Sequence, residues 1–574
     1  MKPILAFYGI PDRYPGERPA YVHDHNLTVW CDGRVQTHLH LERLTCRKMD
    51  NRLPEYLESV LDDLGLKEFD LVSVNSFVGD HLTSQGGRLR IRPDGNMQID
   101  NLNPATAWFQ SEKWAGHAPT AAVVSHELAH IYSCVPFFGP FREKSLLVHF
   151  DGGASVGNFS AWHYRNGRAH LLEVHWELNH LSKLFNDNAL SFALMKARPG
   201  DHGSVPGKLM GYAAMETSSG KMEQWLIRHD YFRNIWDDHK PFYRAALRDW
   251  NWNGHLSEIN DPFLMQVAAG LQSIFQQEIL EKLYTLQRQT GSKYLYYTGG
   301  CALNICTNQK LVQSGRFERV FIPPCCNDSG LSLGAAALLA QSKSDSIHPH
   351  SPYLNNYQLS PIPTQFDAAT IQKTAEIIAI SGVIGVCNGP GEVGPRALGN
   401  RSLLARADSR SLSQHVSQVC KQREWFRPVG PVMLRRNAEL FVGGPVDRLT
   451  DYMLLDYPIL PQYTAELEGV VHQNGTARIQ TLSDRSQNPF LYDLLEYLEQ
   501  QCGIRGLINT SFNRRGEPIV HTTDDARTAA VAMKLNGLIL NGQLWTGNQF
   551  TSTRTHIPST TKTNPSSAGA SSMR

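Results

Sequence analysis

The stretch "TAAVVSHELAHIYSC" (120–134), followed by "SLLVHFDGG" (145–153), places three elements of different kinds close together in the chain. "TAAVVS" has the apolar composition of a strand, "HELAHIYSC" predicts a helix, and "SLLVHF" predicts a strand that runs into a glycine turn. A strand, a helix and a strand in this order indicate an α/β unit. In such a unit the functional site lies at the ends of the strands.

The same alternation continues on both sides of this stretch. Further strands are predicted in "KPILAFYG" (2–9), "FDLVSVNS" (69–76), "KYLYYTGG" (293–300) and "RVFIPP" (319–324). "LTVWCDGRVQTHLHLER" (27–43) predicts a hairpin that turns at Asp32-Gly33. Apolar periodicity predicts helices at 53–66, 262–288 and 329–342. The pattern predicts a first domain of α/β class over residues 1–345.

A second α/β unit is predicted over residues 367–550, after a linker at 346–366 that is rich in Pro, Ser and Asn. Its strands are expected in "VIGVCNG" (383–389), "AELEGVVHQ" (465–473), "ARIQTLS" (477–483) and "GLINTSF" (506–512). The last segment, 551–574, has low complexity and is expected to be disordered.

The composition is that of an ordinary globular protein, with 41% hydrophobic and 19% charged residues over 574 positions. The net charge of +1 gives no general attraction to nucleic acid or to a membrane. Ten cysteines without a C-x-x-C pair indicate reduced thiols. No apolar run reaches the ~20 residues of a membrane helix. We therefore expect a cytoplasmic protein without nucleic-acid or membrane partners.

His126 and His130 are four residues apart, so both imidazoles project from one face of the predicted helix. The letters H-E-L-A-H also match the zinc-peptidase signature, in which the Glu would be the general base. Ser133 and Pro136 stand where the extended metzincin motif needs Gly and His, which excludes that form. Glu127 would point about 100° away from His126. A zinc peptidase with a distant third ligand stays open, as does a plain solvated His pair.

Two aspartates at predicted strand ends are better partners for these histidines. Asp151 follows "SLLVHF" and precedes two glycines, and Asp328 lies between a strand and a small-residue helix. The alternative for each is turn formation, since Asp is common in turns. Two imidazoles with two carboxylates suit iron(II), manganese or zinc, of which we expect iron(II). The predicted metal ligands are His126, His130, Asp151 and Asp328.

A series of motifs follows in the chain: "VPGKLMG", "YTGGCALN", "NDSGLSLGAAA", "GPGEVGPRALGNRSLL", "VCKQREWFRP", "TARIQT" and "NTSFNRRGEPIV". In this order, after HxxxH and Asp-Gly-Gly, they resemble the O-carbamoyltransferases of antibiotic, nodulation-factor and toxin biosynthesis. The resemblance covers about residues 20–545. The blocks Gly394–Ser402 and Asn509–Asn513 are its most specific parts.

The resemblance implies an ASKHA-type (actin-like ATPase) first domain and a YrdC-like second domain. The second domain would convert carbamoyl phosphate and ATP, with Mg²⁺, into carbamoyl adenylate. The first domain would transfer the carbamoyl group to an acceptor hydroxyl and release AMP. The acceptor would be a small-molecule natural product or a sugar, with an amine as the alternative. A homodimer is left open.

The resemblance also implies roles for single residues. The carbamoyl-phosphate and ATP contacts would be Arg396, Arg401, Ser402, Lys421, Arg423, Arg427, Arg478, Asn509, Ser511, Asn513 and Arg515. Fixed cations suit such polyanionic substrates. Gly299, Gly300 and Asn304 would bind the adenylate, and Lys208 would contact the intermediate. His23, in a His-Asp pair nine residues before Asp32, would be the catalytic base.

The first domain departs from the family pattern at three places. It carries the insertion "PDRYPGERPAYV" (11–22), its "DGGASVG" lacks the Glu of the family motif, and "HLSKLFNDNALSFALM" (180–195) is divergent. The second domain matches well, so carbamoyl adenylate formation is predicted more firmly than the acceptor. The alternatives are a zinc metallopeptidase and a non-catalytic nucleotide-binding or tRNA-associated protein.

Overall fold

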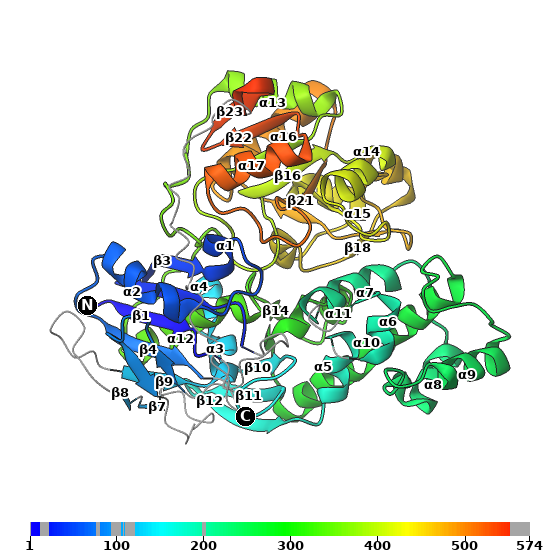
Figure 1. The fold of residues 1–574 in the computed structure, drawn as a ribbon, viewed down its shortest axis with the longest axis horizontal. Helices are drawn as coiled ribbons and strands as arrows, with labels where there is room; N and C mark the ends of the chain where they lie inside the picture. Colours follow the sequence, from blue (N-terminus) through cyan, green and yellow to red (C-terminus); the bar gives the residue numbers. More distant parts are fainter. Residues whose placement is uncertain are drawn as a thin grey trace, which may run out of the picture.

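The computed structural model describes residues 2–11, 22–75, 81–92, 105–106, 108–109, 121–186, 188–197 and 202–550 (Figure 1). The predicted disordered tail, 551–574, and most of the insertion at 11–22 lie outside these residues. The chain is a mixed α/β protein, which confirms the predicted class. In the described part, every helix is too short or too polar to span a membrane.

The first sheet has the order β3-β2-β1-β4-β9-β7. β2 and β3 are the predicted hairpin, and Asp32 (φ 49°) and Gly33 (φ 75°) both take the left-handed conformation that a tight hairpin turn requires. β1 pairs antiparallel with β2 and parallel with β4, and β4 pairs parallel with β9. The strands are β1 (Ile4–Tyr8), β2 (Asn26–Cys31), β3 (Arg34–His40), β4 (Asp70–Val74), β7 (Ala105–Thr106) and β9 (Ala121–Val124).

The second sheet repeats this arrangement with the order β12-β11-β10-β13-β14. Two antiparallel pairings, β11 with β12 and β10 with β11, are again followed by parallel pairings of β10 with β13 and β13 with β14. The strands are β10 (Ser145–Phe150), β11 (Phe159–Arg165), β12 (Arg168–His175), β13 (Tyr294–Thr298) and β14 (Arg319–Phe321). The N-terminal part is therefore built from two sheets of matching strand order.

Two helices, α3 (His126–Tyr132) and α12 (Leu331–Ser342), connect the sheets. α12 packs on β1, β2 and β4, while α3 packs on β10 and β13, and the two helices pack on each other. Their backbones meet at Gly334, where a Cβ atom would overlap the carbonyl oxygen of Ala129. This close packing holds the start of each helix in a fixed position relative to the other.

A helical region extends from the second sheet (Figure 1, green). Its longest element, α10 (Pro262–Thr290), begins at the Asp261 side chain, which accepts a hydrogen bond from Phe263 N, and ends at Gly291 with φ 63°. These are a favourable N-cap and a glycine C-cap. α10 packs against α7 (Val205–Ala213) and α8 (Gly220–Arg228), which places α7 beside the C-terminal part.

The C-terminal part contains one seven-stranded sheet with the order β20-β17-β21-β16-β15-β22-β23 (Figure 1, top). Its strands are β15 (Ile384–Cys387), β16 (Arg401–Arg406), β17 (Gly430–Leu434), β20 (Gln480–Leu482), β21 (Leu507–Ser511), β22 (Gly537–Leu540) and β23 (Gln543–Thr546). The strands predicted in "VIGVCNG" and "GLINTSF" are confirmed as β15 and β21. "ARIQTLS" splits into β19 (Thr476–Ala477) and β20.

The strand predicted in "AELEGVVHQ" is wrong. Residues Pro461–Leu467 form the 3₁₀ helix η7, and a loop follows. Proline favours the first turn of a helix. Leu467 and Val470 are buried three residues apart, which suits a tight turn and not the alternation of a strand.

The predicted linker has no regular helix or strand, yet it binds both parts of the chain. Asn355 exchanges backbone hydrogen bonds with Gly391 (3.1 and 2.9 Å). Its side-chain oxygen accepts a hydrogen bond from His40 N (3.1 Å), at the end of β3. The Tyr353 hydroxyl donates to Leu398 O (2.8 Å). The segment is thus an ordered connection between β3 and the loop after β15.

The contact at Gly334 can be tested by adding one methyl group. We expect Gly334→Ala to lower the free energy of unfolding by about 1–3 kcal/mol, because the new Cβ must push α12 away from α3. Gly207→Ala is the matched control, since Gly207 is also helical and a Cβ there meets no neighbour. That control should be neutral or stabilising by up to about 1 kcal/mol. Denaturant unfolding of both variants gives the comparison, and equal stabilities would contradict the assigned contact.

Candidate metal centre and phosphate-binding cluster

α3 presents its two histidines to one point. Ser125 caps the helix by accepting a hydrogen bond from Leu128 N (3.2 Å), so His126 is the first helical residue. The Nε2 atoms of His126 and His130 lie 3.0 Å apart, and both side chains are buried. The helix ends at Tyr132, as the early proline predicted.

The two predicted carboxylates complete this cluster. Asp328 Oδ1 lies 3.5 Å from His126 Nε2 and 3.4 Å from His130 Nε2, and Asp151 Oδ2 lies 3.4 Å from His130 Nε2. Donor atoms held about 2.1 Å from one tetrahedral ion lie about 3.4 Å from each other. His130, Asp151 and Asp328 offer ligand atoms within 4.8 Å of one another, and His126 lies at similar spacing from His130 and Asp328. The chemistry of these four side chains suits a divalent transition metal.

Backbone N–H groups that follow two strands hold the Asp151 carboxylate in place. Gly152 N and Gly300 N donate to the two oxygens of Asp151, each at 2.5 Å. Gly299, with φ 93°, lies so close to β10 that a Cβ would overlap Phe150 O. The predicted adenylate turn is therefore adjacent to the candidate metal centre. Asn304 is used differently, because its side chain caps α11 (Ile305–Gln313) through Thr307 N (3.1 Å).

Two residues that the sequence did not single out also contact Asp328. The Tyr8 hydroxyl donates to Asp328 Oδ2 (3.3 Å), and Asn26 Nδ2 donates to Asp328 O (2.9 Å). Tyr8 and Asn26 are directly opposite each other on β1 and β2. The position of Tyr8 at the end of the first predicted strand was a signal for this site.

Glu127 faces away from the histidine pair. Its Oε1 accepts hydrogen bonds from Val156 N (2.7 Å) and Gly157 N (3.2 Å), in the loop that follows Asp151. In the same region His126 N donates to Ser155 Oγ (3.0 Å). Glu127 therefore anchors this loop to α3. Glu127 thus does not face the space beside the two histidines, where the Glu of a zinc peptidase activates a water.

His23 lies at the edge of the cluster. Its Nδ1 is 3.1 Å from Asp24 Oδ2 and 3.9 Å from Asp328 Oδ2, and the side chain is 30% exposed. Burial lowers the pKa of His23, but the hydrogen bond and charge of Asp24 and the charges of Asp328 and Asp151 outweigh it and raise the pKa to about 10. His23 is thus protonated at neutral pH unless a cation offsets these carboxylates.

A second cluster gathers basic side chains of the C-terminal part. Lys421 Nζ bonds Asn513 Oδ1 (2.8 Å), Ser511 Oγ (3.2 Å) and the backbone of that loop. Arg423 donates to Thr510 Oγ1 (3.1 Å) and Ser511 Oγ (3.2 Å). The end of β21 therefore holds two of the predicted phosphate contacts side by side.

These cations affect one another's charge: Lys421 is buried, and Arg396, Arg423, Arg427 and Arg478 are half-buried. Burial, with repulsion from other cations, lowers the pKa of Arg396 to about 10 and that of Arg423 to about 9. The pKa values of Lys421 and Arg478 are also lowered, first by burial and then by neighbouring cations. Burial lowers the pKa of Arg427 too, against the opposing charge of Glu424. Like charges held this way provide a site for a polyanion.

Lys48 of the N-terminal part also faces this cluster. The Lys48 side chain is exposed, yet the protein around it lowers its pKa, and the charges of Arg427 and Arg423 lower this pKa further. Sequence analysis assigned no role to Lys48, because it lies in a loop far from the basic motifs of the C-terminal part. The cation cluster is therefore formed by both parts of the chain.

The structure places some predicted contacts outside the phosphate site. Arg401 is buried, and its guanidinium donates to the carbonyls of His521, Asn388, Asn400 and Gly389 at 2.7–3.1 Å. All its donors are used in this way, so the prediction that Arg401 binds phosphate needs correction.

The remaining predicted contacts fall into two groups. Ser402 Oγ accepts from Gly399 N (3.0 Å), and Asn509 Nδ2 bonds Ala397 O (3.1 Å) and Gln480 Oε1 (2.5 Å). Both side chains are buried and make these structural contacts, and their role as ligand contacts stays a prediction. Arg515 is exposed and close enough to Arg427 to lower its pKa.

Lys208 lies at the junction of the two parts. From α7, its Nζ is 3.2 Å from Glu424 Oε1, and Glu424 Oε2 is 3.6 Å from Arg427 Nη1. Four residues along, the Tyr212 ring contacts Phe426 with ring centres 5.1 Å apart. Lys208 therefore faces the cation cluster, and the structure shows no direct contact between it and the histidines.

A short loop separates the two clusters. Cys326 is close enough to Arg396 on one side and to Asp151 on the other for both charges to affect its thiol, whose pKa burial raises to about 12. At the same junction Gly394 packs so tightly that a Cβ would overlap Pro324 O, and Arg43 Nη2 donates to Gly394 O (3.0 Å). The loop 324–328 thus contains the predicted ligand Asp328 and packs against Gly394, two residues before Arg396 of the cation cluster.

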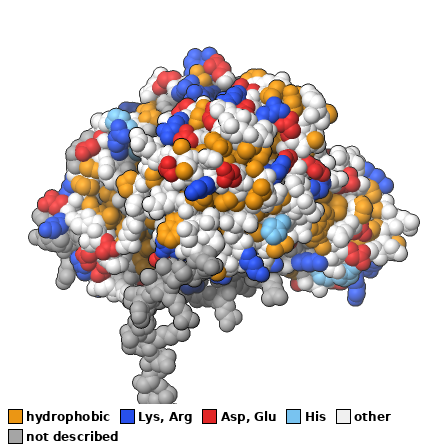
Figure 2. Space-filling view, turned by 90° about the horizontal axis from the view of Figure 1, so that it is seen from above, with side chains coloured by type: hydrophobic (Ala, Val, Ile, Leu, Met, Phe, Trp, Pro, Cys, Tyr) orange, Lys and Arg blue, Asp and Glu red, His pale blue; other side chains and the backbone are white. Residues whose placement is uncertain are grey.

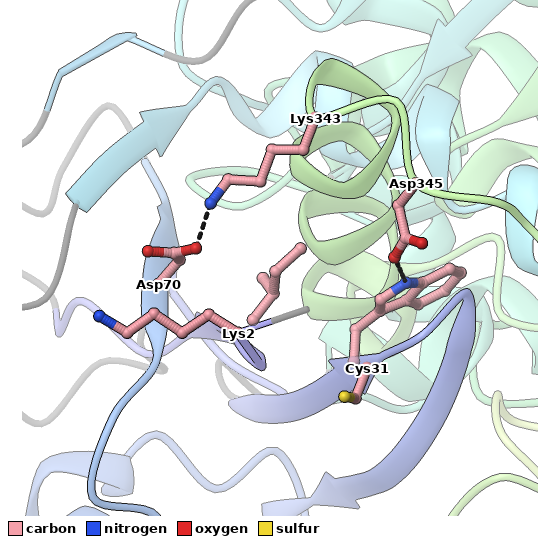
Figure 3. Close-up of a pocket in the computed structure, with 7 residues that line it drawn as sticks. Lys2, Cys31, Asp70, Lys343 and Asp345 are labelled. Atoms are coloured by element: carbon pink, nitrogen blue, oxygen red, sulfur yellow. Dashed lines mark hydrogen bonds and ion pairs between the residues drawn. The ribbon is translucent and has the colours of Figure 1, made fainter.

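The surface shows no comparable concentration of charge on the face in Figure 2, where acidic and basic side chains are interspersed. A cavity of about 200 Å³ opens at the start of β1 (Figure 3). It lies between Lys343, which pairs with Asp70, and Asp345, which accepts from Trp30 Nε1 (3.2 Å). Since Tyr8 at the other end of β1 contacts Asp328, this cavity is remote from the candidate metal centre.

Comparison with known proteins matches the two parts of the chain to two family models. Residues 115–337 match the family model described as carbamoyltransferase N-terminus, and residues 375–546 match carbamoyltransferase C-terminus. Together the two matches cover more than half of the chain, which therefore belongs to the carbamoyltransferase family and is an enzyme of that family.

Relatives are found among nodulation proteins. The chain is 27% identical over 564 residues to nodulation protein NolNO of Sinorhizobium fredii, which covers 91% of this chain and 79% of the relative. It is 38% identical over 341 residues to nodulation protein U of Rhizobium fredii, which covers 54% of this chain and 56% of the relative. The structure of full-length HypF in its phosphate- and nucleotide-bound form aligns with 59% of this chain and 55% of that chain, at 12% identity and a TM-score of 0.31, which is too low to support an argument.

The cation cluster predicts a response to anions. Pyrophosphate should raise the thermal midpoint by ~2–4 °C or more near saturation, because it binds only the folded protein and relieves repulsion among these cations. Arg478→Met should remove most of this shift. The control is Arg485→Met, since Arg485 is partly exposed and pairs with Asp493 (2.7 Å) outside the cluster. Thermal denaturation at constant ionic strength measures the effect, and an undiminished shift in Arg478→Met would exclude Arg478 from the site.

Proposed function

We propose that this enzyme transfers a carbamoyl group from carbamoyl phosphate to a hydroxyl of a small molecule, in two ATP-dependent steps. The cation cluster would form carbamoyl adenylate from carbamoyl phosphate and ATP, with one water consumed and phosphate and pyrophosphate released. The histidine–aspartate cluster would then hold this intermediate during transfer and release AMP. The observation that carries the proposal is the position of loop 324–328, which contains Asp328 and packs against Gly394, two residues before Arg396.

The first step needs neutralisation of several phosphate charges at once. The neutralising cations would come from one buried and four half-buried side chains, whose pKa values are lowered first by burial: Lys421, Arg423, Arg427, Arg396 and Arg478. Mg²⁺ with ATP would share this role. Lys48 would bring a cation from the N-terminal part, so the site would be complete only when the two parts are packed together.

The second step needs a polarised carbonyl and removal of a proton from the acceptor. His126, His130, Asp151 and Asp328 would hold a divalent metal, for which we favour iron(II) over manganese or zinc. When bound, such an ion supplies Lewis-acid polarisation of the carbamoyl oxygen. With the metal offsetting the charges of Asp328 and Asp151, His23 would be neutral. It would then accept the acceptor's proton at Nε2, while Asp24 holds Nδ1. Gly299 and Gly300 would bring backbone close to the adenylate.

The acceptor proposal is a hydroxyl of a natural product or a sugar, with an amine as the alternative. Its support is membership of a family that includes nodulation proteins. One of the divergent segments, the loop 152–157, follows the predicted ligand Asp151 directly and is anchored to α3 by Glu127. This loop would contribute to recognition of an acceptor specific to this chain.

The fold proposal follows the same division. We propose an actin-like ATPase fold for residues 1–345, supported by the two sheets of matching strand order. We propose a YrdC-like fold for residues 367–550, supported by one mixed sheet with the cation cluster at the end of β21. The segment 346–366 would connect them.

The two steps can be separated by variants. We expect Asp328→Asn to lower carbamoyl transfer by about 100-fold or more, because the variant loses a charged ligand at the reacting carbonyl. The same variant should keep carbamoyl-phosphate-dependent exchange between ATP and pyrophosphate within about threefold. Lys421→Met should lose both activities, because Lys421 acts before the steps diverge. Exchange assays with labelled pyrophosphate and AMP release give the comparison.

Each outcome bears on a different part of the proposal. Loss of exchange in Asp328→Asn would show that the clusters do not work separately. Absence of both exchange and AMP release in the unmodified enzyme, with carbamoyl phosphate, ATP, Mg²⁺ and iron(II) present, would reject adenylate chemistry. Arg485→Met is again the control that should change neither step.

The peptidase alternative predicts the opposite behaviour at Glu127. We expect Glu127→Gln to retain carbamoyl transfer within a few fold, because an amide oxygen can still accept from Val156 N and Gly157 N. Glu127→Leu should lower the unfolding free energy by about 1–3 kcal/mol, because two buried donors lose their acceptor. Chelator-sensitive peptide hydrolysis that disappears in Glu127→Gln would support the peptidase instead.

A further inference from the structure

A third histidine lies against the pair on α3. His149 is on β10, is fully buried, and stands two residues before Asp151. Alternate residues of a strand face the same side, so His149 is directed to the side from which Asp151 reaches α3. The ring centre of His149 is 5.0 Å from that of His130 and 6.2 Å from that of His126.

The two nitrogens of His149 have different surroundings. Nδ1 is 3.2 Å from Ser160 Oγ on the neighbouring strand β11, whereas Nε2 is buried and has no hydrogen-bond partner among the residues that the structure describes. One ring nitrogen of each of His126, His130 and His149 lies within 4.8 Å of the others. A buried imidazole nitrogen without a partner is uncommon in a hydrophobic core, where polar groups are normally bonded.

This arrangement is typical of a metal-binding histidine. Such residues usually donate one ring N–H to a nearby acceptor, which fixes the ring and leaves the other nitrogen as the ligand. Ser160 can be that acceptor for Nδ1. His126 and His130 have no such partner at their Nδ1 atoms, so His149 is the best oriented of the three imidazoles.

We propose that His149 is a third imidazole ligand of the candidate metal centre. The inference rests on the proposed function, in which this cluster holds a metal ion. The centre would then have three nitrogen and two carboxylate donors, from His126, His130, His149, Asp151 and Asp328. A nitrogen-rich set favours iron(II), cobalt(II) or zinc over magnesium. Because His149 is the most distant of the three histidines, its loss should weaken binding and not abolish it.

Cobalt(II) titration of the metal-free, full-length protein tests this ligand. We expect His149→Leu to raise the cobalt dissociation constant by about 10–100-fold and to change the ligand-field absorption bands. Ser160→Ala should move both in the same direction by less. His163→Leu is the matched control, since His163 lies on β11 opposite Leu146 and should bind cobalt as the unmodified protein does.

Unchanged affinity and unchanged bands in His149→Leu would overturn the inference. Should that variant fail to fold, pulsed EPR of the unmodified protein loaded with copper(II) decides: three imidazole couplings support the inference and two reject it. Failure of the unmodified protein to bind cobalt or copper would instead reject the metal centre of the proposed function. The two failures are therefore distinguishable.

Discussion

The backbone contact between α3 and α12 at Gly334 is the constraint on which the candidate metal centre depends. α3 begins with the histidine pair and α12 follows directly after Asp328, so the distance between these helices sets the distance between their ligands. Only a residue without a Cβ permits the approach to Ala129. The same two helices join the first sheet to the second, and one packing contact therefore fixes both the fold and the site.

Local patterns predicted much of this arrangement. Strand ends followed by Gly or Asp located Asp151 and Asp328, and the i,i+4 spacing located His126 and His130, because strand and helix geometry determine these positions. Where contacts between distant segments determine the local structure or the role of a side chain, the sequence alone did not predict it. "AELEGVVHQ" has a strand-like composition but begins in a 3₁₀ helix. Arg401 is a cation in a phosphate-binding motif, but its guanidinium donates hydrogen bonds to four backbone carbonyls. Tyr8 and Lys48 reach their sites through folding of distant segments.

The cation cluster and the histidine–aspartate cluster have opposite electrostatic characters on the two sides of one loop. Burial and neighbouring cations lower the pKa values of Arg396 and Lys421, while Asp24, Asp151 and Asp328 raise the pKa of the neighbouring His23. An anionic substrate would neutralise the cation cluster, and a bound metal cation would neutralise the histidine–aspartate cluster. This opposition explains in physical terms why two different steps can occur in adjoining parts of one chain.

The segment around Asn355 has a consequence for the covalent chain itself. Asn355 bridges β3 and Gly391 through backbone pairing, and the Tyr353 hydroxyl bonds Leu398 O. One hydrophobic cluster also continues across the boundary between the two parts. Cutting a single peptide bond after this segment would leave these contacts in place. The two fragments of a chain cut at this bond should thus stay associated through these contacts. The segment 346–366 holds the two parts together by packing and hydrogen bonds as well as by its covalent link.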